Sequence, residues 1–423
     1  MIELDEDSFL LNPIEPGGVV APQGFKAGGV HAGFKKKTDH LDLALIVGEK
    51  PYPTAGMFTK NTFCAAPVSV CRENLGHALH GYCQAVLINA GNANAATGKQ
   101  GLNAARRSTQ ITAEHIGCRP EEVLVASTGV IGVPIEETLF IDAMEGLVSS
   151  ADVSGGRDAA KAIMTTDTRP KEYAVSYIST DPHYKGIEFK IGGMVKGSGM
   201  IMPDMATMIA VLTTDAPLDS NLLHKALDEA VNVSFNKVTV DSDTSTNDSC
   251  FIMASGKAGK ADNLIFLEKS RAYQEFLFAL IHVCETLARD IAIDGEGATK
   301  LITVNISGAA TDDDADKAAR SVANSPLVKT AVFGHDANWG RVAMALGKSG
   351  ATFKQEKVSI VFAGLEVCKK GLALPFDEEE ALRRFKSPEI VIDIDLGAGA
   401  AETTIWTCDY SHDYITINGD YRT

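Results

Sequence analysis

The sequence predicts an α+β fold, a layered α/β sandwich in which helices flank mixed and antiparallel sheets. Short apolar, β-branched runs that are typical of strands recur along all 423 residues. Stretches with helical spacing lie between them, but the two patterns do not alternate as strictly as in a parallel βαβ fold. The composition, with 45% hydrophobic and 22% charged residues, is ordinary for a globular chain that buries an ample core.

The predicted strands are short runs in which apolar residues either alternate with polar ones or fill every position. They are 85–91, 122–126, 187–191, 237–241, 249–254, 301–306, 357–362, 389–395 and 403–407, with a further β-prone run from 208 to 212. The predicted helices carry apolar residues at helical spacing. They are 102–116, 136–150, 157–164, 218–233, 266–292 and 313–322, and Gly295 lies just beyond the end of the longest.

The charge and the N-terminal sequence argue against several classes of partner. A formal net charge of −16 argues against nucleic acid or an anionic membrane as the main partner. No run reaches the ~18 apolar residues that a membrane-spanning helix needs. The first residues, MIELDEDSFL, lack the basic start and apolar core of a secretory signal and the arginine-rich character of a transit peptide. We therefore expect a cytoplasmic protein.

The cysteine and glycine patterns predict neither a metal site nor a bound cofactor. The chain has 8 scattered cysteines and no C-x-x-C, so they are expected to be reduced. Segment 71–83 holds two histidines between two cysteines at a spacing that matches no recognised ligand set. Segment 295–300, GEGATK, lacks the spacing of a phosphate loop, and 395–402, DLGAGAAE, lacks the third glycine of a dinucleotide fingerprint.

The segment 196–215, KGSGMIMPDMATMIAVLTTD, places Ala206-Thr207 between a glycine- and proline-containing stretch and an apolar run. If the Thr207 hydroxyl attacks the carbonyl carbon of Ala206, the chain breaks there and Thr207 becomes a new N-terminus. Thr207 would then carry a nucleophilic hydroxyl and an α-amine, which titrates near pH ~8 and is a usable base. The alternative is an ordinary strand threonine, since Ala-Thr pairs are common and threonine favours strands.

A second group of residues with catalytic potential is Ser127-Thr128-Gly129, which follows the predicted strand 122–126. An acyl-transfer site needs donors aimed at the oxyanion of the tetrahedral intermediate. Glycine lets a backbone N–H approach closely, and the threonine hydroxyl supplies another donor. Taken alone, the same tripeptide is more typical of a turn at the end of a strand.

The segment around Thr207 resembles the processing site of the ornithine acetyltransferase (glutamate N-acetyltransferase) family of arginine biosynthesis. That family's pattern is close to K-G-[SA]-G-M-x-x-P-x-M-A-T-M, followed by an apolar strand and T-T-D-A. The matching positions are Lys196, Gly197, Gly199, Met200, Pro203, Met205, Ala206, Thr207, Met208 and 213–216. The resemblance extends over nearly the whole chain. It departs at Asp204 and at Ser242, where the family has a glycine suited to a backbone with positive φ.

The resemblance implies a role for each residue that matches a functional position of the family. Thr207 would be the nucleophile, and Thr128 with Gly129 would form the oxyanion hole. Thr165 would touch the substrate, with Thr166 as a near alternative. The implied substrate-binding set is Thr165, Lys196, Thr207, Glu296, Asn418 and Thr423. Lys196 would anchor a carboxylate and Glu296 an ammonium, in keeping with their charges.

The resemblance further implies that acetyl moves from N-acetylornithine to glutamate through an acetyl-threonine intermediate, without a cofactor. Whether acetyl-CoA also serves as donor is left open. Self-cleavage would give an alpha fragment, 1–206, and a beta fragment, 207–423, which share one core and associate as a heterotetramer, (αβ)₂, or a larger assembly. The alternative function is an amidase or aminopeptidase that uses the same self-released N-terminal nucleophile and passes the acyl group to water or another amine.

Overall fold

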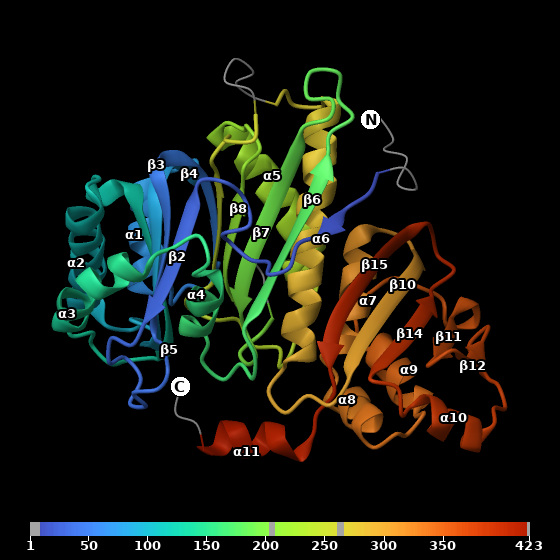
Figure 1. Ribbon diagram of the computed structural model, residues 1–423. Helices are drawn as coiled ribbons and strands as arrows, with labels where there is room; N and C mark the ends of the chain where they lie inside the picture. The colour runs from blue at the N-terminus through green and yellow to red at the C-terminus, as the bar shows by residue number, and fades with distance from the viewer. Residues whose placement is uncertain (1–8, 203–207, 260–265, 421–423) are drawn as a thin grey trace.

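The computed structural model describes residues 9–202, 208–259 and 266–420. Within these residues the chain forms two β-sheets with helices packed against them, which confirms the predicted α+β sandwich (Figure 1). Ala206, Thr207 and Thr423, for which roles were predicted, lie outside the described residues. Among the described helices, none is both long enough and apolar enough to cross a membrane.

The larger sheet has 9 strands in the described part of the chain, in the order β1-β6-β7-β8-β9-β3-β4-β5, with β2 paired to β3. Their bounds are β1 (Asn12–Pro13), β2 (Phe25–Val30), β3 (Leu43–Phe58), β4 (His80–Asn92), β5 (Val123–Val130), β6 (Lys171–Ile178), β7 (Glu188–Lys196), β8 (Ile209–Thr214) and β9 (Ser249–Ala254). The pairs β4–β5 and β8–β9 are parallel, whereas the other pairs are antiparallel, so the sheet is mixed as predicted.

Helices cover both faces of this sheet. One group comprises α1 (Ala66–Leu75), α2 (Gly98–Ile116), α3 (Thr138–Ser150) and α4 (Gly156–Ala162), and the other comprises α5 (Ser220–Val233) and α6 (Arg271–Ile293). In β8, Ile209 and Val211 belong to the core beneath the first group, whereas Ala210 and Leu212 belong to the core beneath the second. Because both faces are covered, β8 is buried throughout and its sequence is continuously apolar at these positions.

The smaller sheet has 6 strands in the described residues, in the order β13-β12-β11-β14-β10-β15. These are β10 (Leu301–Ala309), β11 (Ser359–Phe362), β12 (Leu365–Lys369), β13 (Leu372–Ala373), β14 (Glu389–Asp395) and β15 (Ala401–Cys408). One face packs on α7 (Asp312–Ala323), α8 (Pro326–Phe333), α9 (Trp339–Gly347) and α10 (Glu378–Arg384). The chain then returns toward the larger sheet as α11 (His412–Asp420), which runs beneath that sheet in Figure 1.

The larger sheet contains strands from both sides of the predicted cleavage position between 206 and 207, and these strands are interleaved. Strands β8 and β9, which follow position 207, lie between β7 and β3, which precede it. Backbone hydrogen-bonded ladders therefore join the two parts of the chain on both sides of the β8–β9 pair. The smaller sheet consists of strands that all follow position 207.

One predicted strand, 237–241, is wrong. Phe235–Lys237 forms a short 3-10 helix after α5, and the next residues bond to two different partners. Thr239 N–H donates to the Trp406 carbonyl at 2.9 Å, and Val240 N–H donates to the Ile201 carbonyl at 2.7 Å. The apolar alternation that predicted a strand reflects the burial of Val238 and Val240 rather than a ladder with one neighbouring strand.

Candidate active site

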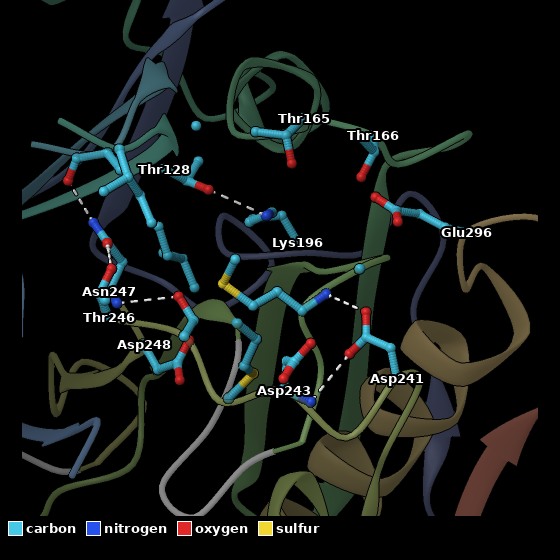
Figure 2. Close-up of a pocket in the computed structure, with 18 of the residues that line it drawn as sticks. Thr128, Thr165, Thr166, Lys196, Asp241, Asp243, Thr246, Asn247, Asp248 and Glu296 are labelled. Carbon is cyan, nitrogen blue, oxygen red and sulfur yellow. Dashed lines mark hydrogen bonds between the residues drawn. The ribbon is translucent and has the colours of Figure 1, made fainter. Parts of the chain in front are cut away.

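A cavity of about 230 Å³ opens where the ends of β5 and β7 meet the segments 165–166, 241–248 and 296 and the helix α11 (Figure 2). Every predicted site residue that the structure describes lines it: Thr128, Gly129, Thr165, Lys196, Glu296 and Asn418, with Thr166 beside Thr165. Met208 and Ile209, which follow Thr207 in the chain, line it as well. Residues that are far apart in the sequence thus share one cavity.

Thr128 and Gly129 lie near the end of β5, where the parallel pairing with β4 slips by a residue. Gly129 has a φ of 128°, a conformation that side chains rarely adopt. A Cβ at this position would lie 2.3 Å from the carbonyl carbon of Gly91 on β4. Both the conformation and the close approach of the two strands explain why the sequence has glycine after Thr128.

Lys196, the last residue of β7, directs its ammonium to Thr128. The Nζ atom donates a hydrogen bond of 3.2 Å to Thr128 Oγ1 (Figure 2). Because an ammonium only donates, the hydroxyl proton of Thr128 is left to bond elsewhere. Burial lowers the pKa of Lys196, and the carboxylates of Asp167, Asp248 and Glu296 oppose that shift. The cavity therefore has a hydroxyl donor and a cation side by side on one wall.

Thr165 and Thr166 follow α4 and both line the cavity. The Thr165 N–H donates to Asp167 Oδ2 at 2.9 Å, which fixes the backbone of this segment. Their positions leave both threonines within the cavity wall, so the choice between them stays open. The asparagine and glutamate that were predicted to bind substrate lie on another part of the wall.

Glu296 is 6% exposed, and its Oε2 accepts a hydrogen bond of 2.7 Å from Asn418 Nδ2 on α11. Its carboxyl group lies against the backbone of Gly199, where a Cβ would come within 2.3 Å of the Glu296 Cδ. Glycine at 199 therefore leaves the space that the carboxylate occupies. Two residues predicted separately, Glu296 and Asn418, form one hydrogen-bonded pair.

The acidic and hydroxyl-rich segment 241–248 forms another wall of the cavity. Asp241 accepts hydrogen bonds from the backbone N–H groups of Met200 (2.6 Å) and Ile201 (2.8 Å). Burial raises the pKa of Asp241, and these two hydrogen bonds oppose the shift. Ser242, which stands where the resembled family has glycine, has a φ of 66°, a left-handed conformation that residues with a side chain rarely adopt.

Asn247 ties this segment to the sheet. Its Nδ2 donates to the carbonyl groups of Ala93 (2.6 Å) and Ser127 (2.7 Å), which lie just beyond β4 and within β5. Its Oδ1 accepts a hydrogen bond of 2.6 Å from Thr246 Oγ1. The segment thereby braces the strand that carries Thr128.

Two features of the site were not predicted. Tyr414 lines the cavity, and its ring stacks on Tyr410 with the ring centres 4.7 Å apart. It lies four residues before Asn418, and a helical interpretation of the C-terminal segment would have placed both on one face. The other feature is a buried ion network of Lys171 with Asp167 and Asp294, which lies behind the cavity wall.

In this network the buried carboxylate of Asp167 is bonded to the ammonium of Lys171 and to the backbone N–H groups of Thr165 and Gly197. Although burial raises the pKa of Asp167, the ammonium groups of Lys171 and Lys196 and the bonds that it accepts hold that pKa well below its ordinary value. Within the described residues, no group of three or more His, Cys, Asp or Glu side chains is arranged to hold a metal ion. The cavity instead offers the hydroxyl of Thr128 as a hydrogen-bond donor, the ammonium of Lys196 and the carboxylate of Glu296.

Comparison with known proteins gives consistent results along the chain. The ArgJ family model matches residues 26–423. The "Arginine biosynthesis bifunctional protein ArgJ" of Symbiobacterium thermophilum is 47% identical over 408 residues, which are 96% of this chain and 99% of that protein. The protein of the same name from Chlorobaculum tepidum is 46% identical over 401 residues, covering 95% and 96% of the two chains.

Solved structures of similar proteins were also found. A crystal structure of ArgJ from Bacillus halodurans is 42% identical, with a TM-score of 0.47, and the match covers 49% of this chain and 97% of that one. A crystal structure of ornithine acetyltransferase from Mycobacterium tuberculosis in complex with ornithine is 36% identical, with a TM-score of 0.41, and the match covers 46% and 99% of the two chains.

By its family model and these sequence relatives, the protein is an acyltransferase of arginine biosynthesis. The chain belongs to the ArgJ family, because the family model and relatives above 40% identity extend over nearly its full length.

Proposed function

We propose that the chain cuts itself between Ala206 and Thr207 and then transfers the acetyl group of N-acetylornithine to glutamate. The observation that supports this proposal is the cavity that Thr128, Gly129, Lys196 and Glu296 line together with Met208, the residue next to Thr207. Such a cavity offers donors for an oxyanion and a charge of either sign for the substrate.

The proposed reaction begins when the Thr207 hydroxyl attacks the acetyl carbonyl carbon and the α-amine of Thr207 takes the hydroxyl proton. The Thr128 hydroxyl and the Gly129 N–H stabilise the oxyanion, each donor contributing roughly 10²–10³-fold in rate. The C–N bond then breaks, and the α-ammonium returns the proton to the departing amine of ornithine. An acetyl ester remains on Thr207.

In the second half of the reaction, the amine of glutamate attacks that ester, and the collapse of the intermediate restores the Thr207 hydroxyl and releases N-acetylglutamate. An amide is exchanged for an amide through an ester, so the acetyl group needs no further activation. Water must be kept from the ester, which requires a cavity that closes around its substrates. We expect ping-pong kinetics, since ornithine leaves before glutamate reacts.

Charge complementarity supports an amino-acid substrate with more than one charged group. Lys196 would anchor a carboxylate, and the Glu296–Asn418 pair would receive an ammonium. Thr165 and Thr423 complete the proposed substrate-binding set, of which Thr423 lies outside the described residues. Acetyl-CoA remains a second proposed donor, in line with the word "bifunctional" in the names of the relatives.

The proposed fragments are 1–206 and 207–423. Strands β8 and β9 lie between strands of the first fragment, so the shared sheet supports two pieces that stay together after cleavage. We propose a cytoplasmic enzyme whose fragments associate as (αβ)₂ or a larger assembly. Size measurement of the purified protein under native conditions tests that assembly.

Mass spectrometry of the purified protein together with an acetyl-transfer assay tests the function. We expect a fragment that begins at Thr207, an acetyl adduct on that fragment in the presence of N-acetylornithine alone, and N-acetylglutamate once glutamate is added. Thr207→Ala should give an uncut, inactive chain. Activity in an uncut chain, or acetyl release to water in place of glutamate, would refute the proposal.

A further inference from the structure

A fully buried lysine lies behind the cavity wall and is not one of the residues that line the cavity. Lys171 is the first residue of β6, and its Nζ lies 2.6 Å from Asp167 Oδ1. The same Nζ bonds to Asp294 Oδ2. The side chains of Lys171 and Asp167 are 0% exposed and that of Asp294 is 4% exposed. Removing one partner from such a buried network leaves a charge uncompensated in a medium of low polarity.

Each of the two carboxylates holds a different segment of the cavity wall. Asp167 accepts hydrogen bonds from the N–H groups of Thr165 (2.9 Å) and Gly197 (2.8 Å), the latter being the residue after Lys196. Asp294 accepts from both the N–H and the hydroxyl of Thr168. Lys171 thus joins the threonine segment, the end of β7 and the end of α6.

The connection reaches Glu296 through the backbone. Ser198 Oγ donates to the Asp294 carbonyl at 2.6 Å, and the Glu296 N–H donates to the Ser198 carbonyl at 2.9 Å. The segment that carries the proposed ammonium ligand is therefore bonded to the segment that carries the proposed carboxylate ligand, and both are tied to the ion network.

The charges indicate what Lys171 does beyond holding these segments. Asp167 lies beside a second cation, because it accepts the 2.8 Å hydrogen bond from the N–H of Gly197, the residue after Lys196, and the charge of Lys196 helps to lower the pKa of Asp167. Burial lowers the pKa of Lys35, and the charge of Asp167 opposes that shift. The Nζ of Lys35, however, donates to the Leu41 carbonyl at 2.8 Å. With Lys171 in place, Asp167 has a direct cationic partner and Lys196 bonds to Thr128 instead.

We propose that Lys171 is a positioning residue that satisfies Asp167 and thereby keeps the ammonium of Lys196 available to the carboxylate of the substrate. The inference rests on the proposed function, in which Lys196 anchors that carboxylate. Without Lys171, the buried Asp167 draws Lys196 toward itself, and the cavity loses its cation. The oxyanion donors at the end of β5 are held by Asn247 and stay in place.

The test compares two acetyl donors in the full-length enzyme. N-acetylornithine has a carboxylate for Lys196 to bind, whereas p-nitrophenyl acetate has none and reports only acylation of the nucleophile. The variants are Lys171→Met and the double variant Lys171→Met with Asp294→Asn, which removes one cation and one anion and so keeps the net charge of the network. The control is Lys237→Met, which breaks an ion pair of 2.9 Å with Asp316, outside the residues that line the cavity.

For both Lys171 variants, we expect KM for N-acetylornithine to rise about 10- to 100-fold, the value of one lost hydrogen bond between charged groups. The rate of acylation by p-nitrophenyl acetate should stay within about threefold of the unmodified enzyme. The control should leave both values unchanged. The double variant should fold even if the single variant does not, since it keeps the net charge of the buried network unchanged.

Three results would overturn the role of Lys171: a KM in the double variant close to that of the unmodified enzyme, an equal loss with both donors, or failure of the double variant to fold. A general collapse of the site predicts the equal loss, so the comparison of donors separates positioning from structural damage. Failure of the unmodified enzyme to transfer acetyl from either donor would instead defeat the proposed function itself.

Discussion

Replacing Gly199 by alanine tests whether the Glu296 carboxylate is held in the cavity by the space that glycine leaves. The added Cβ would lie 2.3 Å from both Cδ and Oε2 of Glu296 and 2.4 Å from Oε1. Contact between non-bonded atoms is comfortable at about 3.5 Å, so the carboxylate must withdraw by about 1 Å. Its hydrogen bond of 2.7 Å from Asn418 Nδ2 cannot survive unchanged.

Gly199→Ala should weaken substrate binding much more than it lowers the stability of the fold. A displacement of about 1 Å at a substrate-positioning group costs up to about 10²-fold in kcat/KM, and we expect most of that loss in KM for N-acetylornithine. The fold should tolerate the change, because the clash is with the end of a flexible side chain and the φ of Gly199 is not left-handed. The lower entropy of the unfolded chain, worth about 0.4–1 kcal/mol, offsets part of the lost hydrogen bond.

The assay is steady-state acetyl transfer over a range of N-acetylornithine concentrations, with the free energy of unfolding from urea titration. Gly146→Ala is the matched control, because Gly146 lies in α3 with nothing near its Cβ position and should gain stability without any change in KM. A KM for Gly199→Ala that equals that of the control would refute the placement of Glu296 at the substrate. A large loss of stability would refute the argument that the side chain simply yields.

Two further perturbations probe the oxyanion donors and the buried acids. Thr128→Val keeps the shape of the side chain but removes the hydroxyl, so acylation by p-nitrophenyl acetate should slow by roughly 10²–10³-fold, and an unchanged rate would exclude Thr128 as a donor. Asp215 is fully buried, and burial raises its pKa from 3.8 to about 6 although the N–H groups of Gln23 and Lys190 bond to it. Between pH 3.8 and about 6, Asp215 therefore holds a proton in the folded state that it has lost in the unfolded state. Its contribution to the free energy of unfolding falls as pH rises through that range, by about 3 kcal/mol at most. Asp215→Asn should flatten the slope of unfolding free energy against pH there, and parallel slopes would contradict the assignment.

Much of the fold was predictable because its signals are local. Helix α2 appears where helical spacing predicted it. Of the strands from β9 to β15, all were predicted from apolar or alternating runs except the short β12 and β13. Helix α6 begins at Arg271, later than predicted, because Ser270 caps it by accepting from the Tyr273 N–H at 3.2 Å. Burial of Val238 and Val240 imitates a strand, which explains the error at 237–241.

The site was predictable only where a motif marked it. The resemblance supplied Thr128, Lys196 and Glu296, and the structure brings them to one cavity. The ion network left a weaker trace. Asp167 and Lys171 stand four residues apart, a spacing that ordinarily indicates a solvated pair on a helix, and Asp294 is 123 residues further along the chain. Long-range pairing of this kind depends on the tertiary fold, which no local pattern encodes.

Gly199 and Ser242 illustrate two physical reasons for glycine that a family pattern cannot tell apart. At Ser242 the family's glycine suits a left-handed backbone, and a serine with a φ of 66° adopts that backbone at a cost of roughly 1 kcal/mol, with its side chain exposed to solvent. At Gly199 the backbone is ordinary, and the glycine leaves room for a carboxylate. The departure at 242 therefore alters stability slightly and leaves the cavity intact, whereas the same kind of change at 199 would move a proposed substrate ligand. At 199 the consequence is decided by the position of Glu296, a residue about a hundred positions further along the sequence, so the reason for glycine there comes from the fold.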